Sequence, residues 1–520
     1  MDKEGDRERL LLESNARPSL MRLLSINHKS AQKGSDGTTT STTTGTLKST
    51  SANDDDAPFS LEDLPTPAFV INRHAFAGNC QRVLDFCTST SSSTTNSGAT
   101  STAYKLRPHI KTHKTLEGIH LQAHGTGKSS SHAVNGFVAS TIPEVKLLVN
   151  YYTTNSTENA GSILYGIPIS ETKLPPLFVL QQRLDDWTTR QQNKANKDHH
   201  IPIHILIDHP QQVQMVEQFL AKQEQEQEQQ SAATFSVFVK LDTGYHRAGT
   251  TCDKQGIQLV TAILQSKALR LVGFYSHCGH AYDVEDQSKL QEIANTDMNT
   301  IQQFLMDLEK HWNNNNNNNN INPQQVFDKC IISVGSTPSL FHHPTNNSSN
   351  SNEWQAFQQR HTTLQFEIHP GNYTLYDRQQ LHTSACADPQ HIAGRVLSRV
   401  IGHYDDDHRP QTVLLDAGAT ALTKETTPQG GMAAIAFVEN VDVYRMSQEA
   451  SMARRRHNTT ASDNKSLLEE LPLGSMVTLL PNHSCLAAAC FDTYYVIDDP
   501  SCRFLPETAI VEEWIPVKGW

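Results

Sequence analysis

Eight short apolar runs recur along the middle of the chain, and longer polar segments separate them. The runs cover residues 105–111, 136–141, 163–166, 204–208, 235–244, 271–278, 330–334 and 364–369. Between them, apolar positions recur at helical spacing over 142–152, 211–225, 256–266 and 285–309. Strands that are apolar along most of their length are typical of parallel sheets covered on both faces. The pattern predicts an α/β fold, a closed (β/α)8 barrel, with a doubly wound open sheet as the alternative because spacing alone does not show closure.

The pattern changes after about residue 390. Strand-like runs follow at 392–404, 412–416, 432–444, 475–480 and 493–497, with few helices between them. These runs predict a second, β-rich domain. Residues 446–471, which contain the arginines 454–456, are expected to form a long exposed loop. An earlier run at 66–71 is expected to be a leading strand that can lie outside the barrel sheet.

These patterns divide the chain into three parts. Residues 1–57 are rich in Ser, Thr, Lys and Asp and are expected to be a disordered tail. Residues 58–385 are assigned to the barrel and residues 386–520 to the β-rich domain. Low-complexity inserts at 88–101, 223–230 and 313–320 interrupt the barrel, and we expect them to be solvated loop expansions, which loops tolerate cheaply.

Composition and charge indicate the cellular compartment of the protein and the partners that it does not bind. The chain carries 43 Lys and Arg against 55 Asp and Glu, a net charge of −12, which argues against a nucleic-acid partner. Nine cysteines without a CxxC spacing favour a reducing compartment. The sequence contains no run of about 18 apolar residues, so we expect no membrane span. The charged first residues do not resemble a signal peptide. We therefore expect a cytoplasmic protein without a membrane partner.

The first apolar run ends in a cluster of basic residues, Arg107 to Lys114, with Lys111 at its centre. Neighbouring positive charge and partial desolvation both favour the neutral form of a lysine amine. A neutral amine can attack a carbonyl and hold a Schiff base. The alternative is a basic strand end that has no chemical role.

Two further strand ends and one segment near the C-terminus suggest ligand sites. Gly335–Ser339 and His369–Tyr373 follow the last two runs, where barrels of this kind often bind phosphate, although such sequences also form ordinary turns. His483 and Cys485 stand two residues apart, so in an extended segment both side chains point to one face. Imidazole and thiolate suit zinc, and two protein ligands would leave open positions for substrate. A buried cysteine beside a surface histidine is the alternative.

Taken together, residues 107–114, 275–282, 335–338, 369–373 and 481–485 resemble the eukaryotic D-serine dehydratases, a pyridoxal-phosphate (PLP) family with the alanine-racemase-like fold type III. The resemblance implies a PLP- and Zn²⁺-dependent carbon–oxygen lyase that converts D-serine to pyruvate and ammonia, and a homodimer. It implies that Lys111 is the Schiff-base lysine and Cα base, and that the zinc ligands are His483 and Cys485. The residues that it implies as cofactor contacts are Lys111, Thr141, Arg247, Tyr275, Tyr282, Thr337, Gly371 and Asn372.

Three alternatives remain open at this stage. A D-threo-3-hydroxyaspartate dehydratase could use the same lysine and metal pair with an added cationic contact. A D-threonine aldolase is similar around the lysine, but that family carries an aspartate where Cys485 stands. A non-enzymatic PLP-binding protein of the same barrel class usually lacks the second domain.

Overall fold

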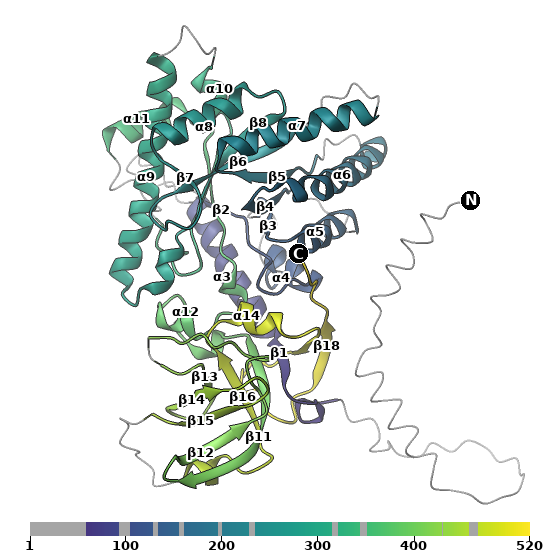
Figure 1. Ribbon diagram of the computed structural model, residues 1–520, viewed down its shortest axis with the longest axis vertical. Coiled ribbons are helices and arrows are strands. Elements are labelled where there is room, and N and C mark those ends of the chain that lie inside the picture. The colour runs from purple at the N-terminus through teal and green to yellow at the C-terminus, as the bar shows by residue number, and fades with distance from the viewer. Residues whose placement is uncertain are drawn as a thin grey trace, which may run out of the picture.

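The computed structural model describes residues 59–92, 104–127, 134–154, 161–195, 200–227, 234–314, 321–343, 351–428, 430–456 and 466–520. The expected tail at 1–57 lies outside these residues. In Figure 1 a unit of strands and helices stands above a smaller β-rich unit. No helix within the described ranges is both long and apolar enough to cross a bilayer.

The larger unit is a parallel barrel. Its strands pair in the order β2-β10-β9-β8-β6-β5-β4-β3, and isolated parallel bridges Leu106–Val134 and His109–Val138 join the two ends of this path. The sheet therefore closes, and the open-sheet alternative is excluded. The strands are β2 Tyr104–Leu106, β3 Phe137–Ala139, β4 Ile163–Pro168, β5 Ile203–Ile207, β6 Phe235–Asp242, β8 Leu269–Ser276, β9 Ile331–Val334 and β10 Gln365–Ile368. The short β7 (Thr250–Thr251) pairs with β6.

Helices cover the outside of the barrel. Leu259, Val260 and Ile263 of α8 show the pattern, because these positions share one helix face and all are buried. The described beginnings of the three low-complexity inserts continue helices α3, α7 and α9, and the remainder lies outside the described residues. The helices are α3 Arg73–Ser92, α4 Leu116–His124, α5 Ile142–Thr154, α6 Leu174–Ala195, α7 Pro210–Gln227, α8 Lys254–Gln265, α9 Gln287–Asn314, α10 Pro323–Phe327 and α11 Asn352–Arg360.

The smaller unit is a mostly antiparallel sheet, and it includes the first described strand of the chain. Its order is β12-β15-β14-β13-β16-β11-β1-β17-β18, with β12 also paired to β11. The assignment of residues 58–385 to the barrel therefore does not fit β1, which pairs with β11 and β17. The strands are β1 Ala68–Asn72, β11 Gly394–Asp406, β12 Arg409–Leu415, β13 Ala433–Ile435, β14 Val441–Met446, β15 Ser451–Arg455, β16 Met476–Pro481, β17 Tyr494–Ile497 and β18 Ile510–Trp514.

The prediction of one long exposed loop at 446–471 is wrong. Residues 451–455 form β15, which pairs with β12 and β14, and a short helix α13 (Leu467–Glu470) follows residues 457–465, which are not described. Arg455 and Arg456 are held by Glu470 and Asp442. Paired arginines at a strand end do not need full exposure, because their charge is matched locally.

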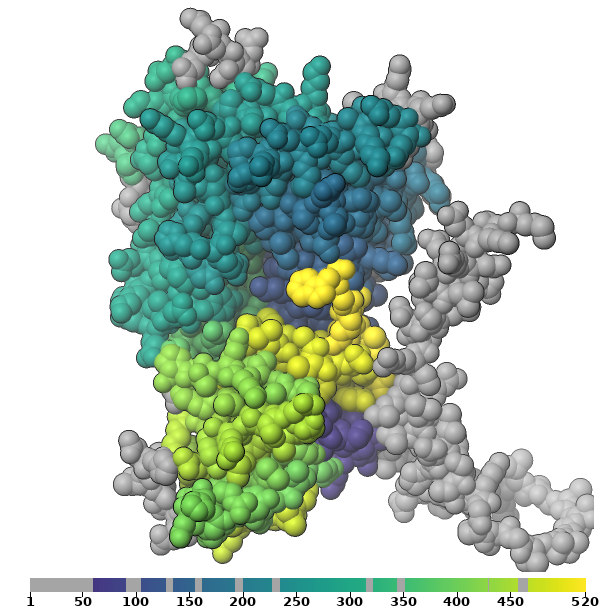
Figure 2. All heavy atoms as spheres, viewed as in Figure 1, coloured from purple at the N-terminus to yellow at the C-terminus, as the bar shows by residue number. Residues whose placement is uncertain are grey.

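Two short helices join the units, α12 (Arg378–His382) after β10 and α14 (Ser484–Ala489) after β16. Both lie between the barrel and the second sheet in Figure 1. The C-terminal end crosses the same junction, because the amide of Val517 donates to the carbonyl of Lys114 at 2.9 Å. Figure 2 shows this end, in yellow, resting over the boundary between the units. The carboxyl ends of the barrel strands therefore face the second sheet.

Candidate active site

A cavity of about 330 Å³ lies at the carboxyl ends of the barrel strands, where this fold class places its active sites. Six of the eight predicted cofactor contacts line it: Lys111, Arg247, Tyr275, Tyr282, Thr337 and Gly371. The lining also includes residues that are not among the eight predicted cofactor contacts, namely His109, Ser140, Lys240, His277, Ser336 and His369. All six stand at or just beyond strand ends, so their position was the signal that could have found them.

Lys111 lies in a turn five residues beyond the end of β2, and its side chain is partly buried. The chain is held there by the bridge at His109, and the Lys111 amide donates to His109 Nδ1 at 3.2 Å. Burial, followed by the charge of Lys111, holds the pKa of His109 well below its usual value. Gly371 faces the lysine closely, because an added Cβ would lie 3.5 Å from Lys111 Cε. The lysine therefore projects into the cavity beside a neutral imidazole and a glycine.

The cavity is lined by three cationic side chains, Lys111, Lys240 and Arg247, and no described carboxylate lines it. Lys240 is 5% exposed and its ammonium lies 5.0 Å from the centre of the Tyr275 ring. Burial and then the charge of Arg247 lower the pKa of Lys240 to about 8. Although Asp208, Asp242 and Asp297 act on Lys240 from outside the lining, three cations in a concave, partly desolvated site favour an anionic ligand.

Stacked rings form one wall of this cavity. The rings of Tyr275 and His369 stack with centroids 4.0 Å apart, and the His277 ring stacks with that of His369 at 5.9 Å. Burial is the main cause of the low pKa values of His277 and His369, which lie well below the usual value for histidine. His369 Nδ1 contacts the Ser333 hydroxyl at 2.9 Å, whereas the buried Nε2 has no hydrogen-bond partner among the described residues. A neutral ring with an open nitrogen can bind a polar group of a ligand.

The loops after β9 and β10 meet at Thr337. Its hydroxyl accepts from the amides of Gly371 and Asn372, at 3.3 and 3.0 Å, and Tyr282 contacts it from the adjoining η5 helix (Gly279–Asp283). Gly335 begins the β9 loop with φ of +107°, a conformation that favours glycine. Amides and hydroxyls thus converge at the cavity end where phosphate sites are common in this fold.

Two predicted contacts do not line the cavity. The Thr141 hydroxyl accepts from the amide of Glu144 at 3.3 Å, as a cap of α5, and its neighbour Ser140 lines the cavity instead. The Asn372 side chain donates to Asp377, so only its backbone amide takes part in the Thr337 loop. In both cases a nearby backbone or carboxylate partner holds the side chain.

His483 and Cys485 lie beside this cavity. The thiol of Cys485 is 3.2 Å from the hydroxyl of Thr112, the residue after Lys111. Although burial opposes both shifts, mutual hydrogen bonding with Cys485 raises the pKa of His483 to about 11 and lowers that of Cys485. The segment is not extended throughout as expected, because Cys485 lies in the first turn of α14, yet the two side chains still meet. An imidazole beside a thiol is a donor pair suited to zinc once both groups have lost their protons.

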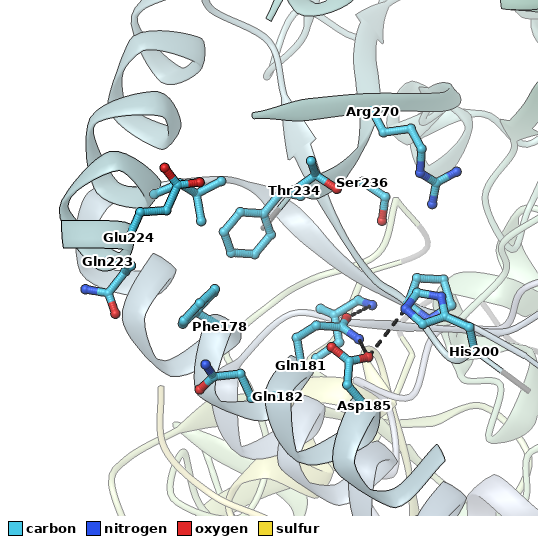
Figure 3. A pocket seen from close by; sticks show the side chains of 14 residues that line it. Phe178, Gln181, Gln182, Asp185, His200, Gln223, Glu224, Thr234, Ser236 and Arg270 are labelled. Carbon is cyan, nitrogen blue, oxygen red and sulfur yellow. Dashed lines mark hydrogen bonds and ion pairs between the residues drawn. The ribbon is translucent and has the colours of Figure 1, made fainter. Parts of the chain in front are cut away.

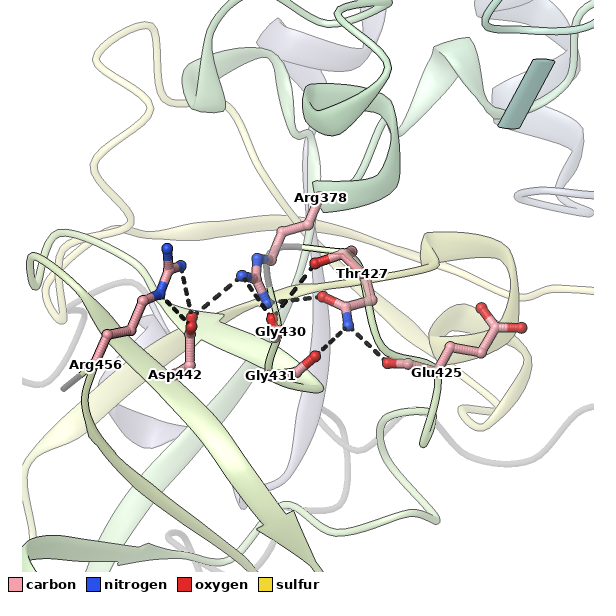
Figure 4. A network of polar contacts seen from close by, with 8 residues as sticks. Arg378, Glu425, Thr427, Gly430, Gly431, Asp442 and Arg456 are labelled. Atoms are coloured by element: carbon pink, nitrogen blue, oxygen red, sulfur yellow. Dashed lines mark hydrogen bonds and ion pairs between the residues drawn. The ribbon is translucent and has the colours of Figure 1, made fainter. Parts of the chain in front are cut away.

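A polar network fixes the segment before His483 (Figure 4). Asn482 accepts from Arg378 at 2.8 Å and donates to the carbonyls of Glu425 and Gly431. Arg378 also pairs with the buried Asp442 at 3.2 Å, which Arg456 contacts from the other side. The Glu425 carboxylate in turn lies 3.0 Å from His483 Nδ1. Such outer contacts orient metal-binding imidazoles.

A second cavity of about 320 Å³ lies at the opposite end of the barrel (Figure 3). It is lined by residues before or at the beginnings of β5, β6 and β8, such as His200, Thr234 and Arg270. Asp185 there contacts His200 at 3.4 Å and Gln181 at 2.8 Å. This end of a barrel usually serves stability, so we place the active site at the first cavity.

Two family models match the chain, the alanine racemase N-terminal domain over residues 101–317 and a putative serine dehydratase domain over residues 393–497. The D-serine dehydratase of Schizosaccharomyces pombe is 29% identical over 468 residues, covering 88% of this chain and 93% of the relative. That of Saccharomyces cerevisiae is 28% identical, covering 89% and 97%.

Among solved structures, D-threo-3-hydroxyaspartate dehydratase from Delftia sp. HT23 is similar with a TM-score of 0.63 and 22% identity. The match covers 89% of this chain and all of that one, and it shows a shared fold. A cysteine-to-alanine mutant of that relative is described as metal-free.

The barrel, the second sheet and the lysine-containing cavity define an alanine-racemase-like enzyme of fold type III, the class to which PLP enzymes of this architecture belong. Within that class, three curated relatives are D-serine dehydratases, and a fourth, 22% identical, is a D-threo-3-hydroxyaspartate dehydratase. Over most of its length the chain is similar to the eukaryotic D-serine dehydratases, at 29%, 28% and 24% identity to three of them.

Proposed function

We propose that the protein is a PLP- and zinc-dependent lyase that removes water from D-serine by β-elimination, giving pyruvate and ammonia. One observation carries the proposal. Thr112, which follows Lys111, contacts the Cys485 thiol at 3.2 Å, so an amine and a thiolate–imidazole pair serve one site. Elimination needs both, because a proton leaves Cα while a hydroxyl leaves the neighbouring Cβ.

The cavity fits PLP and a substrate carboxylate, both of which are anionic. Lys111, Lys240 and Arg247 supply positive charge, and the unpartnered Nε2 of His369 offers a contact. We assign the phosphate to the loops of Thr337 and Gly371, with the amide of Asn372 and the Tyr282 hydroxyl. We assign the pyridine ring of PLP to the wall formed by Tyr275. Arg247 would contact that ring, and Thr141 would support the wall through its neighbour Ser140.

When bound, PLP draws electron density from Cα so that its proton becomes acidic, and zinc stabilises the negative charge on the departing oxygen. Lys111, as the neutral amine, is the group we assign to accept the Cα proton at Nζ. The Cβ–O bond breaks, and the hydroxyl leaves as water after it gains a proton. Hydrolysis of the released enamine takes up one water and yields the keto acid and ammonia.

His483 and Cys485 are the residues we assign to the zinc ion. Two protein ligands leave coordination positions open for the substrate hydroxyl, as a catalytic ion requires. The Glu425 carboxylate can keep Nδ1 of His483 as a donor, which directs the other ring nitrogen to the metal. The metal-free state of the cysteine mutant of the Delftia relative is consistent with a cysteine ligand in this fold.

We also propose a cytoplasmic homodimer. All nine cysteines are free, and five of them lie at or near the strands and helices of the barrel. Free cysteines suit a reducing compartment. The resemblance to the eukaryotic D-serine dehydratases supports the dimer, with the active site near the subunit interface. Size-exclusion chromatography with light scattering measures the mass of the particle in solution. The mass of a monomer would contradict the proposed dimer.

A steady-state comparison tests the substrate. We expect the highest kcat/KM for D-serine, lower values for D-threonine, and none for L-serine. D-threo-3-hydroxyaspartate is the second candidate, because Lys240 and Arg247 could hold its second carboxylate. A higher kcat/KM for that acid would replace D-serine as the assigned substrate, and cleavage of D-threonine to glycine would indicate an aldolase.

Lys111→Ala tests the lysine. Added PLP should no longer give the visible absorption band that the wild-type protein shows, and elimination should be lost. Lys240→Ala is the matched control, because it removes a lysine from the same cavity and should leave the band in place. A band retained by Lys111→Ala would disprove the assignment.

A further inference from the structure

A second group of potential metal ligands is buried in the barrel wall, outside the cavity lining. Cys278 follows β8, Asp297 lies on α9 and His343 lies in the turns after β9. Their sulfur, carboxylate oxygen and ring nitrogen all lie within 4.8 Å of one another, and the residues are 0%, 1% and 2% exposed. The proposed reaction uses none of them.

The polar atoms of this group are incompletely satisfied. Asp297 Oδ1 accepts from the hydroxyls of Thr243 and Ser276, and the Cys278 thiol lies within hydrogen-bonding reach of the carboxylate, whose Oδ2 has no nitrogen or oxygen partner within the described residues. His343 Nε2 lies 3.3 Å from the Ser339 hydroxyl, and the buried Nδ1 has no partner there either.

No lysine, arginine or histidine forms an ion pair with Asp297 in the described part of the chain. A buried carboxylate without a cation is unfavourable, and so is each unpartnered buried atom. The group therefore offers negative charge and free lone pairs in a closed space. Among the described residues no cation forms an ion pair with the carboxylate, and the buried Lys240 acts on it only at longer range.

We propose that Cys278, Asp297 and His343 bind a structural divalent metal ion, best matched by zinc, distinct from the ion assigned to His483 and Cys485. One thiolate, one imidazole and one carboxylate are the donor types that zinc accepts, and the thiolate disfavours Mg²⁺ and Ca²⁺. The hydroxyls of Thr243 and Ser276 stand next to the carboxylate and can complete the coordination or hydrogen-bond to a fourth ligand.

The position of this site gives the ion a role. It joins the end of β8, the helix α9 and the loop after β9. The Ser339 hydroxyl connects His343 to the amide of Ser336 at 3.0 Å, and Ser336 lines the cavity. His277, next to Cys278, contacts the carbonyl of Gly335 at 3.0 Å. A metal here would fix the proposed phosphate loop from behind.

Metal content of the purified PLP-loaded protein tests the proposal. We expect two equivalents of zinc per chain in the wild type, one in Cys485→Ala, one in Cys278→Ser and none in the double variant. Cys330→Ser, which alters a buried cysteine at the start of β9, is the control and should retain both equivalents. A Cys485→Ala protein without zinc, or a Cys278→Ser protein with two equivalents, would overturn the second site.

X-ray absorption on Cys485→Ala keeps the test decisive if Cys278→Ser does not fold. The remaining zinc should show one sulfur neighbour at about 2.3 Å, the usual Zn–S distance. Zinc without sulfur, or with more than one, would exclude Cys278 as the ligand in this arrangement. One equivalent of zinc in both the wild type and Cys485→Ala would instead support the buried site and remove the metal from the proposed reaction, so the two proposals can fail separately.

Discussion

Replacing Asp442 by asparagine should destabilise the second domain strongly, because it leaves a buried arginine without its counterion. The Arg378 and Asp442 side chains are 6% and 8% exposed and lie 3.2 Å apart. Breaking a buried pair by removing one partner typically costs about 3–5 kcal/mol. Arg378 would keep the Asn482 oxygen at 2.8 Å as a neutral acceptor, so we expect the lower end, about 3 kcal/mol.

The Asp442→Asn substitution should also affect the proposed metal site. Arg378 holds Asn482, which precedes His483, so looser placement should weaken zinc binding by about tenfold, the usual effect of an outer contact. Urea unfolding followed by circular dichroism and tryptophan fluorescence measures the first effect, and competition with a chromophoric chelator measures the second. Asp406→Asn, which breaks the exposed pair with Arg409, is the control. A loss of stability no larger than in that control would refute the reasoning.

Three further predictions concern the cavity. Cys485→Ala should keep the visible band given by PLP but lose elimination, and full turnover by this variant or by chelated wild-type protein would contradict the metal role. Because burial and Arg247 lower the pKa of Lys240 to about 8, its charge is lost as the pH rises through that value. PLP affinity should therefore decline above pH 8, and a titration of Lys240→Met should not show this decline; an unchanged decline would point to another group. Gly371→Ala adds a Cβ 3.5 Å from Lys111 Cε at an unstrained φ of −120°. The protein should fold normally, and kcat/KM should fall about tenfold because the lysine is displaced. An unchanged kcat/KM would show that the lysine has room to move.

The apolar runs predicted the barrel well, because each strand is buried and therefore continuous in its hydrophobicity. All eight predicted strands are present, although Lys111 lies beyond β2 rather than within it. Closure could not be predicted, since it depends on bridges such as His109–Val138 that no local pattern encodes. β15 was missed because its arginines suggest solvent, whereas pairing with Glu470 and Asp442 lets them end a strand.

The candidate site was predicted in part for a similar reason. Glycines and hydroxyls at strand ends mark where a ligand can approach, and Thr337 and Gly371 line the cavity as expected. Side chains with a nearby competing partner were not predictable, as Asn372 shows by turning to Asp377. Lys240 was not predicted as a site residue: its position near the end of an apolar run was a signal, but the run does not show that the side chain enters the cavity. Its burial follows from the closed sheet.

The central place of β1 in the second sheet has a consequence for how the polypeptide is assembled on the ribosome. β1 is among the first ordered segments to emerge, but one of its two neighbours, β17, is made almost last. Its other neighbour, β11, also follows the barrel in sequence, so both backbone edges of the apolar residues 69–71 stay unpaired while the barrel is being synthesised. A fragment starting at residue 386 would lack the strand that separates β11 from β17, so the two units are not separable by a single cut.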